Sequence, residues 1–122
     1  MVKALIVEDN AFFSQAFKDS LQIRFPSMII EAMEDGNGIL QKVDAFLPHL
    51  IFMDIRLPGK NGFELTKEIK SAHPDMIVII MTSYNLPEYR DAALKCGVAH
   101  FIPKDSLDMK EIETLIKSFH LK

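Results

Sequence analysis

Short apolar runs alternate along the chain with longer segments of helical periodicity, and this alternation constrains the fold more than any other feature. Runs of this length, rich in β-branched residues and bounded by Gly, Pro, Asn or Asp, are typical of buried strands. The predicted strands cover Lys3 to Val7, Ser27 to Ala32, Leu50 to Met53, Met76 to Met81 and Ala99 to Ile102.

The segments between these runs carry apolar residues on one helix face. In the first segment, Phe13, Phe17 and Leu21 recur every four residues. Pro87 suits a helical first turn, and Gly97 suits a helical C-terminus. Four predicted helices cover Ala11 to about Arg24, Ile39 to about Leu47, Phe63 to Ala72, and Pro87 to near Cys96. In the second of them, Leu40, Val43 and Leu47 are expected to face inward. A last helix is capped by Asp105 or Ser106 and buries Ile112, Leu115, Ile116 and Phe119.

Strands that alternate with helices are joined by right-handed crossovers, which produce a parallel sheet covered on both faces. We therefore expect an α/β fold, a (βα)5 doubly wound parallel sheet with helices on both faces. The 122 residues contain neither a linker nor a repeat, so we expect one domain over residues 1–122.

Composition argues against several classes of protein. The apolar runs are far shorter than the about 18 residues needed to span a bilayer, so we expect no membrane contact. The single cysteine, Cys96, excludes an internal disulfide and suits the reducing cytoplasm. The histidines are too far apart in sequence for a zinc motif. The net charge of −3 comes from interspersed charges without a basic stripe, so we expect no direct nucleic-acid binding.

Polar side chains follow four of the predicted strands. Glu8 and Asp9 follow the first strand, and Asp54 follows the third. Thr82 follows the fourth strand, and Lys104 lies just beyond the fifth. Each residue alone would usually be a solvated turn, capping or surface residue. Because the carboxyl ends of parallel strands meet at one edge, where such folds bind ligands, their joint placement favours a functional site.

Three carboxylates in one crevice repel each other unless cations offset their charge. The ammonium of Lys104 offsets one negative charge, and one divalent cation would neutralise the remaining two. A small set of oxygen ligands favours Mg²⁺ over a dedicated Ca²⁺ cage. Phosphoryl oxygens can fill the open positions of such an ion, and a neighbouring carboxylate can act as nucleophile. These residues therefore predict phosphoryl transfer to an aspartate.

Four segments carry a pattern that is specific in combination: Val7-Glu8-Asp9-Asn10, Met53-Asp54-Ile55-Arg56-Leu57-Pro58-Gly59-Lys60-Asn61-Gly62, Met81-Thr82-Ser83 and Phe101-Ile102-Pro103-Lys104. Through them the chain resembles, over essentially its whole length, the receiver domain of bacterial two-component response regulators. The resemblance implies a flavodoxin-like fold with strand order 2-1-3-4-5. It also implies a cytoplasmic receiver (response regulatory) domain over residues 1–122.

The resemblance assigns roles to the polar residues. Asp54 would be the phosphoacceptor, supplied by a phosphohistidine of a sensor histidine kinase. Asp9 and Asp54 would bind Mg²⁺ directly, Glu8 through water, and Arg56 through its backbone carbonyl. Lys104 would pair with the phosphoryl oxygens. We expect no conventional substrate turnover, because the chain would only accept and lose its own phosphoryl group.

The resemblance also implies a conformational switch. Thr82 would move its hydroxyl to the phosphoryl group, and Phe101 would swing into the space released. The change would reach the surface of the fourth helix, fifth strand and fifth helix. This surface would contact an output domain or a downstream protein, or form a phosphorylation-dependent homodimer. The stretch from Phe101 to Ser106 is most similar to receivers joined to helix-turn-helix domains, which favours a transcriptional output.

Two further residues are expected to set the lifetime of the phosphoryl group. Arg56 lies two residues after Asp54, and Tyr84 lies two residues after Thr82. We expect their side chains to border the phosphoryl group and to shield it from water. The chain also departs from the commonest receiver pattern, because Glu8 stands where many members have Asp. Many receivers have a proline after the lysine, with a cis bond, whereas Pro103 here precedes Lys104.

Other functions compete with this interpretation. A phosphatase of the haloacid-dehalogenase type would need a pair of aspartates after the first strand, where Glu8-Asp9-Asn10 stands. In a flavodoxin-like flavin carrier, Glu8 and Asp9 would repel the flavin phosphate. Gly36-Asn37-Gly38 begins a dinucleotide fingerprint, but Gln41 occupies the third glycine position. A receiver-like module that binds proteins without being phosphorylated is the main alternative.

Overall fold

The computed structural model describes residues 1–121, in which five strands alternate with five α-helices. The strands are β1 (Lys3–Val7), β2 (Ile29–Met33), β3 (Leu50–Asp54), β4 (Ile77–Thr82) and β5 (His100–Pro103). The α-helices are α1 (Ala11–Arg24), α2 (Ile39–Phe46), α3 (Gly62–Ala72), α4 (Pro87–Lys95) and α5 (Met109–Ser118). A short 3₁₀ helix, η1 (Lys104–Ser106), lies between β5 and α5.

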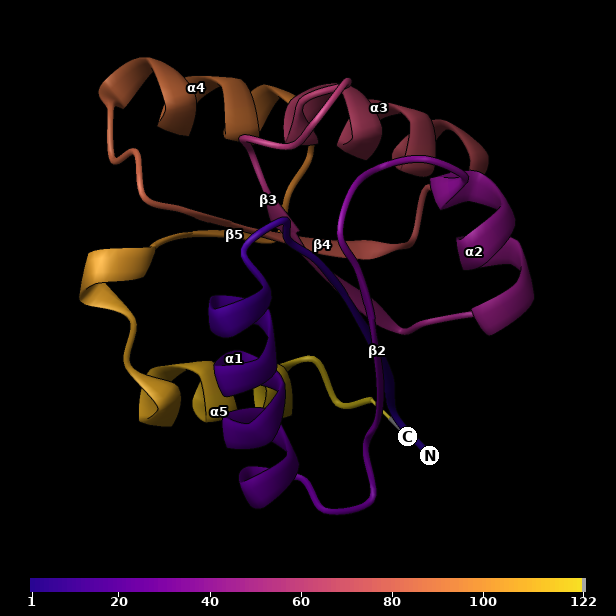
Figure 1. Ribbon diagram of the computed structural model, residues 1–122, viewed down its shortest axis with the longest axis vertical. Helices are drawn as coiled ribbons and strands as arrows, with labels where there is room; N and C mark the ends of the chain where they lie inside the picture. Colours follow the sequence, from indigo (N-terminus) through magenta and orange to yellow (C-terminus); the bar gives the residue numbers. More distant parts are fainter. Residues whose placement is uncertain (122) are drawn as a thin grey trace.

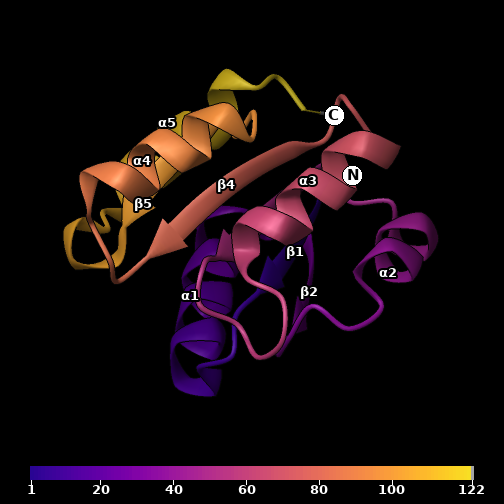
Figure 2. The ribbon, with the colours of Figure 1, turned by 90° about the horizontal axis from the view of Figure 1, so that it is seen from above.

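The strands form one parallel sheet in the order β2-β1-β3-β4-β5. Helices α1 and α5 cover one face, and α2, α3 and α4 cover the other (Figure 1). Seen from above, α4, α3 and α2 follow one another across their face (Figure 2). The predicted (βα)5 flavodoxin-like fold, its strand order and its helices on both faces are confirmed.

The core consists of two apolar layers, one on each side of the sheet. Because successive strand residues point to opposite faces, Ile51 and Met53 pack towards α2 and α3, whereas Leu50 and Phe52 pack towards α1 and α5. Every residue of β3 is buried, as expected for a central parallel strand. None of the helices within residues 1–121 combines the length and the apolar character that a bilayer crossing requires.

The strand register brings the ends of the inner strands to one edge. Val7 of β1 pairs with Met53 of β3, and Asp54 pairs with Met81 of β4. The residue after β1, Glu8, is anchored by its backbone N–H, which donates to the carbonyl oxygen of Met33 at 3.0 Å. The residues that follow these inner strands therefore lie at the same edge of the sheet.

Two helix ends differ from the prediction. Helix α5 is capped by Asp108, whose side chain accepts from the N–H of Lys110 at 2.9 Å. Asp105 and Ser106 instead lie in η1, because Leu107 packs against the core below α1 and α5 before the helix begins.

Leu47, which is predicted to face inward on α2, is instead the C-cap residue of that helix, with φ 54° and 62% exposure.

Candidate functional site

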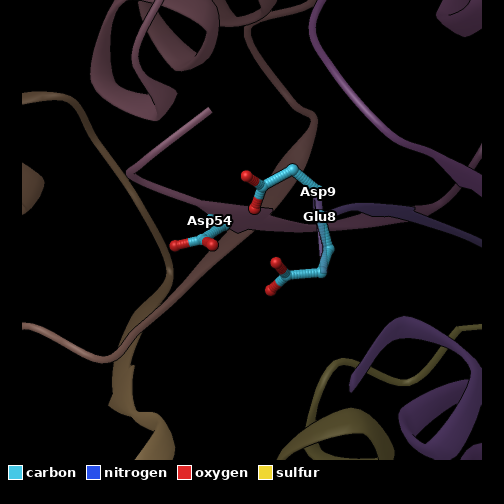
Figure 3. A group of neighbouring side chains, drawn as sticks. All are labelled: Glu8, Asp9 and Asp54. Carbon is cyan, nitrogen blue, oxygen red and sulfur yellow. The ribbon is translucent and has the colours of Figure 1, made fainter. Parts of the chain in front are cut away.

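Three carboxylates meet at the carboxyl ends of β1 and β3. Glu8 and Asp9 follow β1, and Asp54 ends β3. One carboxylate oxygen from each residue lies within 4.8 Å of the others (Figure 3). Glu8 and Asp54 are buried, whereas Asp9 is exposed. The structure thus brings together the three carboxylates that the sequence placed at this edge.

Lys104 brings a positive charge to this cluster from the end of the edge strand β5. It is the first residue of η1, directly after β5. Its Nζ donates to Oε1 of Glu8 and, at 3.2 Å, to Oδ2 of Asp54. Only 14% of the Lys104 side chain is exposed, so water screens both ion pairs weakly.

The carboxyl of Glu8 has a raised pKa. Burial raises the pKa of Glu8, and the neighbouring charge of Asp54 raises it further. Hydrogen bonds from Lys104 and from the backbone N–H of Asn10, at 2.9 Å, act in the opposite direction but do not overcome burial. Three carboxylates beside the ammonium of Lys104 leave the cluster short of positive charge.

This shortage of positive charge fits a hard divalent cation. The oxygen donors lie close enough to share one ion, and carboxylates are the ligands that Mg²⁺ prefers. A bound cation would favour the charged form of Glu8, which burial disfavours. The residues present fit Mg²⁺, and the predicted contribution of the Arg56 backbone carbonyl stays a prediction.

Thr82 and Phe101 lie in the two strands beside this edge. Thr82 ends β4 and is fully buried, and its hydroxyl oxygen accepts from the N–H of Tyr84 at 3.0 Å. Phe101 lies on β5, half-buried against the core layer below α2 and α3. The guanidinium of Arg90, in α4, lies 4.9 Å from the centre of the Phe101 ring. The structure therefore connects Phe101 to α4 rather than to the carboxylates.

Arg56 and Tyr84, which were both predicted to border the phosphoryl group, lie against each other. The guanidinium carbon of Arg56 is 4.2 Å from the centre of the Tyr84 ring. The sequence did not indicate the third member, Tyr89 of α4, whose ring lies 6.3 Å from that of Tyr84 and perpendicular to it. A hydrogen bond with Tyr89 raises the pKa of Arg56. The loop after β3 is thus connected to the first turn of α4.

Comparison with known proteins decides the family. The sequence matches the response regulator receiver domain over residues 4–117. The chain belongs to this family. Receiver domains act in two-component systems, so the resemblance seen in the sequence is confirmed.

Curated relatives are longer than this chain. The transcriptional regulatory protein LnrK of Bacillus subtilis is 28% identical over 118 residues, which are 97% of this chain and 52% of LnrK. A protein-glutamate methylesterase/protein-glutamine glutaminase of Methanococcus maripaludis is 32% identical over 124 residues, covering 95% of this chain and 33% of that protein. The chain spans about half, or less, of the length of these relatives.

Solved structures show the same fold. The signal receiver domain of a DNA-binding response regulator from Colwellia psychrerythraea superposes with a TM-score of 0.91 at 24% identity, covering 98% of each chain. The response regulator TrrA from Thermotoga maritima, solved in complex with Mg²⁺-BeF, has a TM-score of 0.83 at 26% identity. That match covers 97% of this chain and 98% of TrrA.

Proposed function

We propose that this chain is a phosphorylation-activated signalling switch in which Asp54 accepts a phosphoryl group from a sensor histidine kinase. One observation carries the proposal: Oδ2 of Asp54 lies 3.2 Å from Nζ of Lys104, inside the carboxylate cluster with Glu8 and Asp9. An anionic nucleophile and a cation that can follow the transferred charge are thereby held at one point. In this proposal residues 1–122 form one receiver domain.

The transfer is a displacement at phosphorus. A carboxylate oxygen of Asp54 attacks the phosphorus of the phosphohistidine, a P–O bond forms, and the P–N bond breaks. The departing imidazole nitrogen keeps the electron pair of the broken bond, and a proton on the other ring nitrogen of the phosphohistidine makes the leaving group a neutral imidazole. Lys104 then moves from the Asp54 carboxylate to the phosphoryl oxygens, where its charge is again paired.

Mg²⁺ would neutralise negative charge on the transferred group. Asp9 and Asp54 are the proposed direct ligands, Glu8 would act through water, and Arg56 would contribute its backbone carbonyl. The 4.8 Å cluster and the raised pKa of Glu8 support this assignment.

Thr82 and Phe101 are the proposed relay. The Thr82 hydroxyl oxygen accepts a hydrogen bond from Tyr84, so its own proton can be donated to a phosphoryl oxygen. The space left by Thr82 would admit Phe101, which lies on the neighbouring strand. Because Arg90 of α4 stacks on the Phe101 ring, movement of that ring would alter the α4–β5–α5 surface.

That surface is the proposed contact with an output domain, a downstream protein or a second phosphorylated copy. The names of the curated relatives LnrK and DegU describe transcriptional regulatory proteins, which supports a transcriptional output. DNA binding would then belong to another domain. We propose a cytoplasmic location and no turnover of an external substrate by this chain.

Arg56 and Tyr84 are the proposed determinants of phosphoryl lifetime. Their stacked side chains come from the loops that follow β3, which ends at Asp54, and the neighbouring strand β4. A stack in this position would restrict the approach of water to the phosphorus. The contact with Tyr89 would hold the stack in place.

Incubation with acetyl phosphate and Mg²⁺, followed by intact mass spectrometry, tests the proposal. We expect the mass of one phosphoryl group on the wild type and none on Asp54→Asn. Asp105→Asn, which removes an exposed carboxylate of η1, should behave like the wild type. Failure of the wild type to gain the phosphoryl group would favour the main alternative, a protein-binding module that is not phosphorylated.

A further inference from the structure

An aromatic ring of α1 lies against the ammonium of Lys104. Nζ of Lys104 is 4.3 Å from the centre of the Phe13 ring, well inside the range of cation–π attraction. The same nitrogen donates to the carboxylates of Glu8 and Asp54. The ammonium is therefore held by two anions and by one aromatic ring.

The Phe13 ring is itself fixed on the structure that carries the carboxylates. The backbone N–H of Phe13 donates to the side chain of Asn10, the N-cap of α1, at 3.0 Å. Its ring stacks on Phe17, with centroids 5.9 Å apart and planes inclined by 9°. Phe17 in turn contacts Phe52 edge to face at 4.9 Å. Phe52 is fully buried in β3, two residues before Asp54, so the ring is tied to the strand that bears the nucleophile.

We propose that Phe13 is a positioning residue that holds the Lys104 ammonium at the site through a cation–π contact. The inference rests on the proposed function of Asp54 and adds a residue to it. Lysine has a long, flexible side chain, and conversion of the Asp54 carboxylate to an acyl phosphate removes one of its anchors. The Phe13 ring and Glu8 would retain the ammonium within reach of the phosphoryl oxygens during this exchange.

The surroundings of the contact favour attraction over mere packing. Cation–π contacts are strongest when the cation is shielded from water, and only 14% of the Lys104 side chain is exposed. Leucine at position 13 would fill much of the same volume against Phe17 but would lack the negative face of the ring. The chain also offers a matched control, because the neighbouring Phe12 is 91% exposed.

Nuclear magnetic resonance tests the contact itself, without Mg²⁺ or a phosphoryl donor. Protons on the Lys104 side chain beside an aromatic face resonate at an unusually high field. We expect this shift in the wild type and in Phe12→Leu, and its loss in Phe13→Leu. An ordinary Lys104 resonance in the wild type, or an unchanged one in Phe13→Leu, would overturn the contact.

The rate of phosphorylation tests the role. Phe13 is replaced by phenylalanines with one, two or three ring fluorines, which weaken the negative face stepwise and change the shape little. We expect the initial rate with acetyl phosphate and Mg²⁺ to fall with each fluorine, and to be about three- to thirtyfold lower in Phe13→Leu. Phe12→Leu should keep the wild-type rate.

Rates that do not depend on fluorination would overturn the positioning role, even if Phe13→Leu fails to fold. This result differs from failure of the proposed function, in which the wild type would gain no phosphoryl group. In that case the resonance measurement would still decide whether Phe13 holds Lys104.

Discussion

The first residue of α3, Gly62, packs directly on the backbone of Asp54. A Cβ atom at Gly62 would fall far inside van der Waals contact of the Asp54 carbonyl oxygen, 2.9 Å from its carbonyl carbon and 3.0 Å from Cα of Ile55. The N–H of Gly62 also donates to the carbonyl of Ile55 at 2.8 Å. The loop that follows the proposed phosphoacceptor can close back on the strand only because this residue has no side chain.

Gly62→Ala should therefore destabilise the protein, because backbone atoms cannot move aside as a side chain can. We expect urea denaturation to show a free energy of unfolding lower by about 2 kcal/mol or more. Gly36→Ala is the comparison, since its Cβ would meet the buried side chain of Leu65, which can shift at a smaller cost than backbone. Equal losses in the two variants would contradict the proposed importance of the backbone contact.

The stability of the protein should depend on the charge of Glu8. Burial raises the pKa of Glu8 above 4.5, so the folded state binds this proton more tightly than the unfolded state. The contribution is complete below a pH of about 4.5 and is lost as the pH rises through the raised pKa. In EDTA, the free energy of unfolding of the wild type should therefore fall relative to that of Glu8→Gln as the pH rises.

Glu113 provides a control of opposite sign for that measurement. A hydrogen bond from Lys117 lowers the pKa of Glu113, so its small contribution is present above pH 4.5 and is lost as the pH falls. Denaturation curves of the wild type, Glu8→Gln and Glu113→Gln across this range separate the two effects. A difference between the wild type and Glu8→Gln that does not change with pH would contradict the account of Glu8.

Mg²⁺ should stabilise the folded chain through the carboxylate cluster. A ligand present at a hundred times its dissociation constant stabilises by about 2.7 kcal/mol, and EDTA should reverse the effect. Thermal denaturation with and without Mg²⁺ measures it. Asp9→Asn should lose most of the stabilisation, whereas Asp105→Asn should retain it. Equal stabilisation of these two variants would place the ion elsewhere.

The phosphorylated protein should lose its phosphoryl group faster when the stack over the site is removed. We expect Arg56→Ala combined with Tyr84→Ala to dephosphorylate severalfold faster, because water would reach the phosphorus more easily. Phosphate release after removal of acetyl phosphate gives the rate. Leu86→Ala is the control, since Leu86 and Tyr84 are similarly exposed, at 42% and 41%. An unchanged rate in the double variant would refute the shielding role.

The α/β layout could be predicted from sequence because it depends on local patterns. The continuous apolar run of β3 indicates a strand covered on both faces, and the turn and cap residues mark where helices end. The strand order came from the family resemblance, because periodicity alone does not determine which strands are neighbours. The meeting of Glu8, Asp54 and Lys104 could be predicted as soon as the sheet was predicted to be parallel, because parallel strands end at one edge.

Contacts between side chains that are distant in sequence could not be predicted in the same way. Phe13 fits the buried stripe of α1, and nothing in its spacing distinguishes a core ring from one beside Lys104. In the sequence Tyr89 looks like an ordinary helix residue, and only the folded structure brings α4 beside the loop that carries Arg56. The predicted start of α5 was wrong because several possible capping residues lie close together in the sequence, and the packing of Leu107 decides which of them caps the helix.

Chemical trapping of the phosphorylated residue tests the central claim most directly. The protein is incubated with acetyl phosphate and Mg²⁺, reduced with borohydride, digested and sequenced by mass spectrometry, because reduction converts an aspartyl phosphate to homoserine. We expect homoserine at position 54 and none when Mg²⁺ or acetyl phosphate is omitted. Trapping at Asp9 or at another carboxylate, with Asp54 intact, would contradict it.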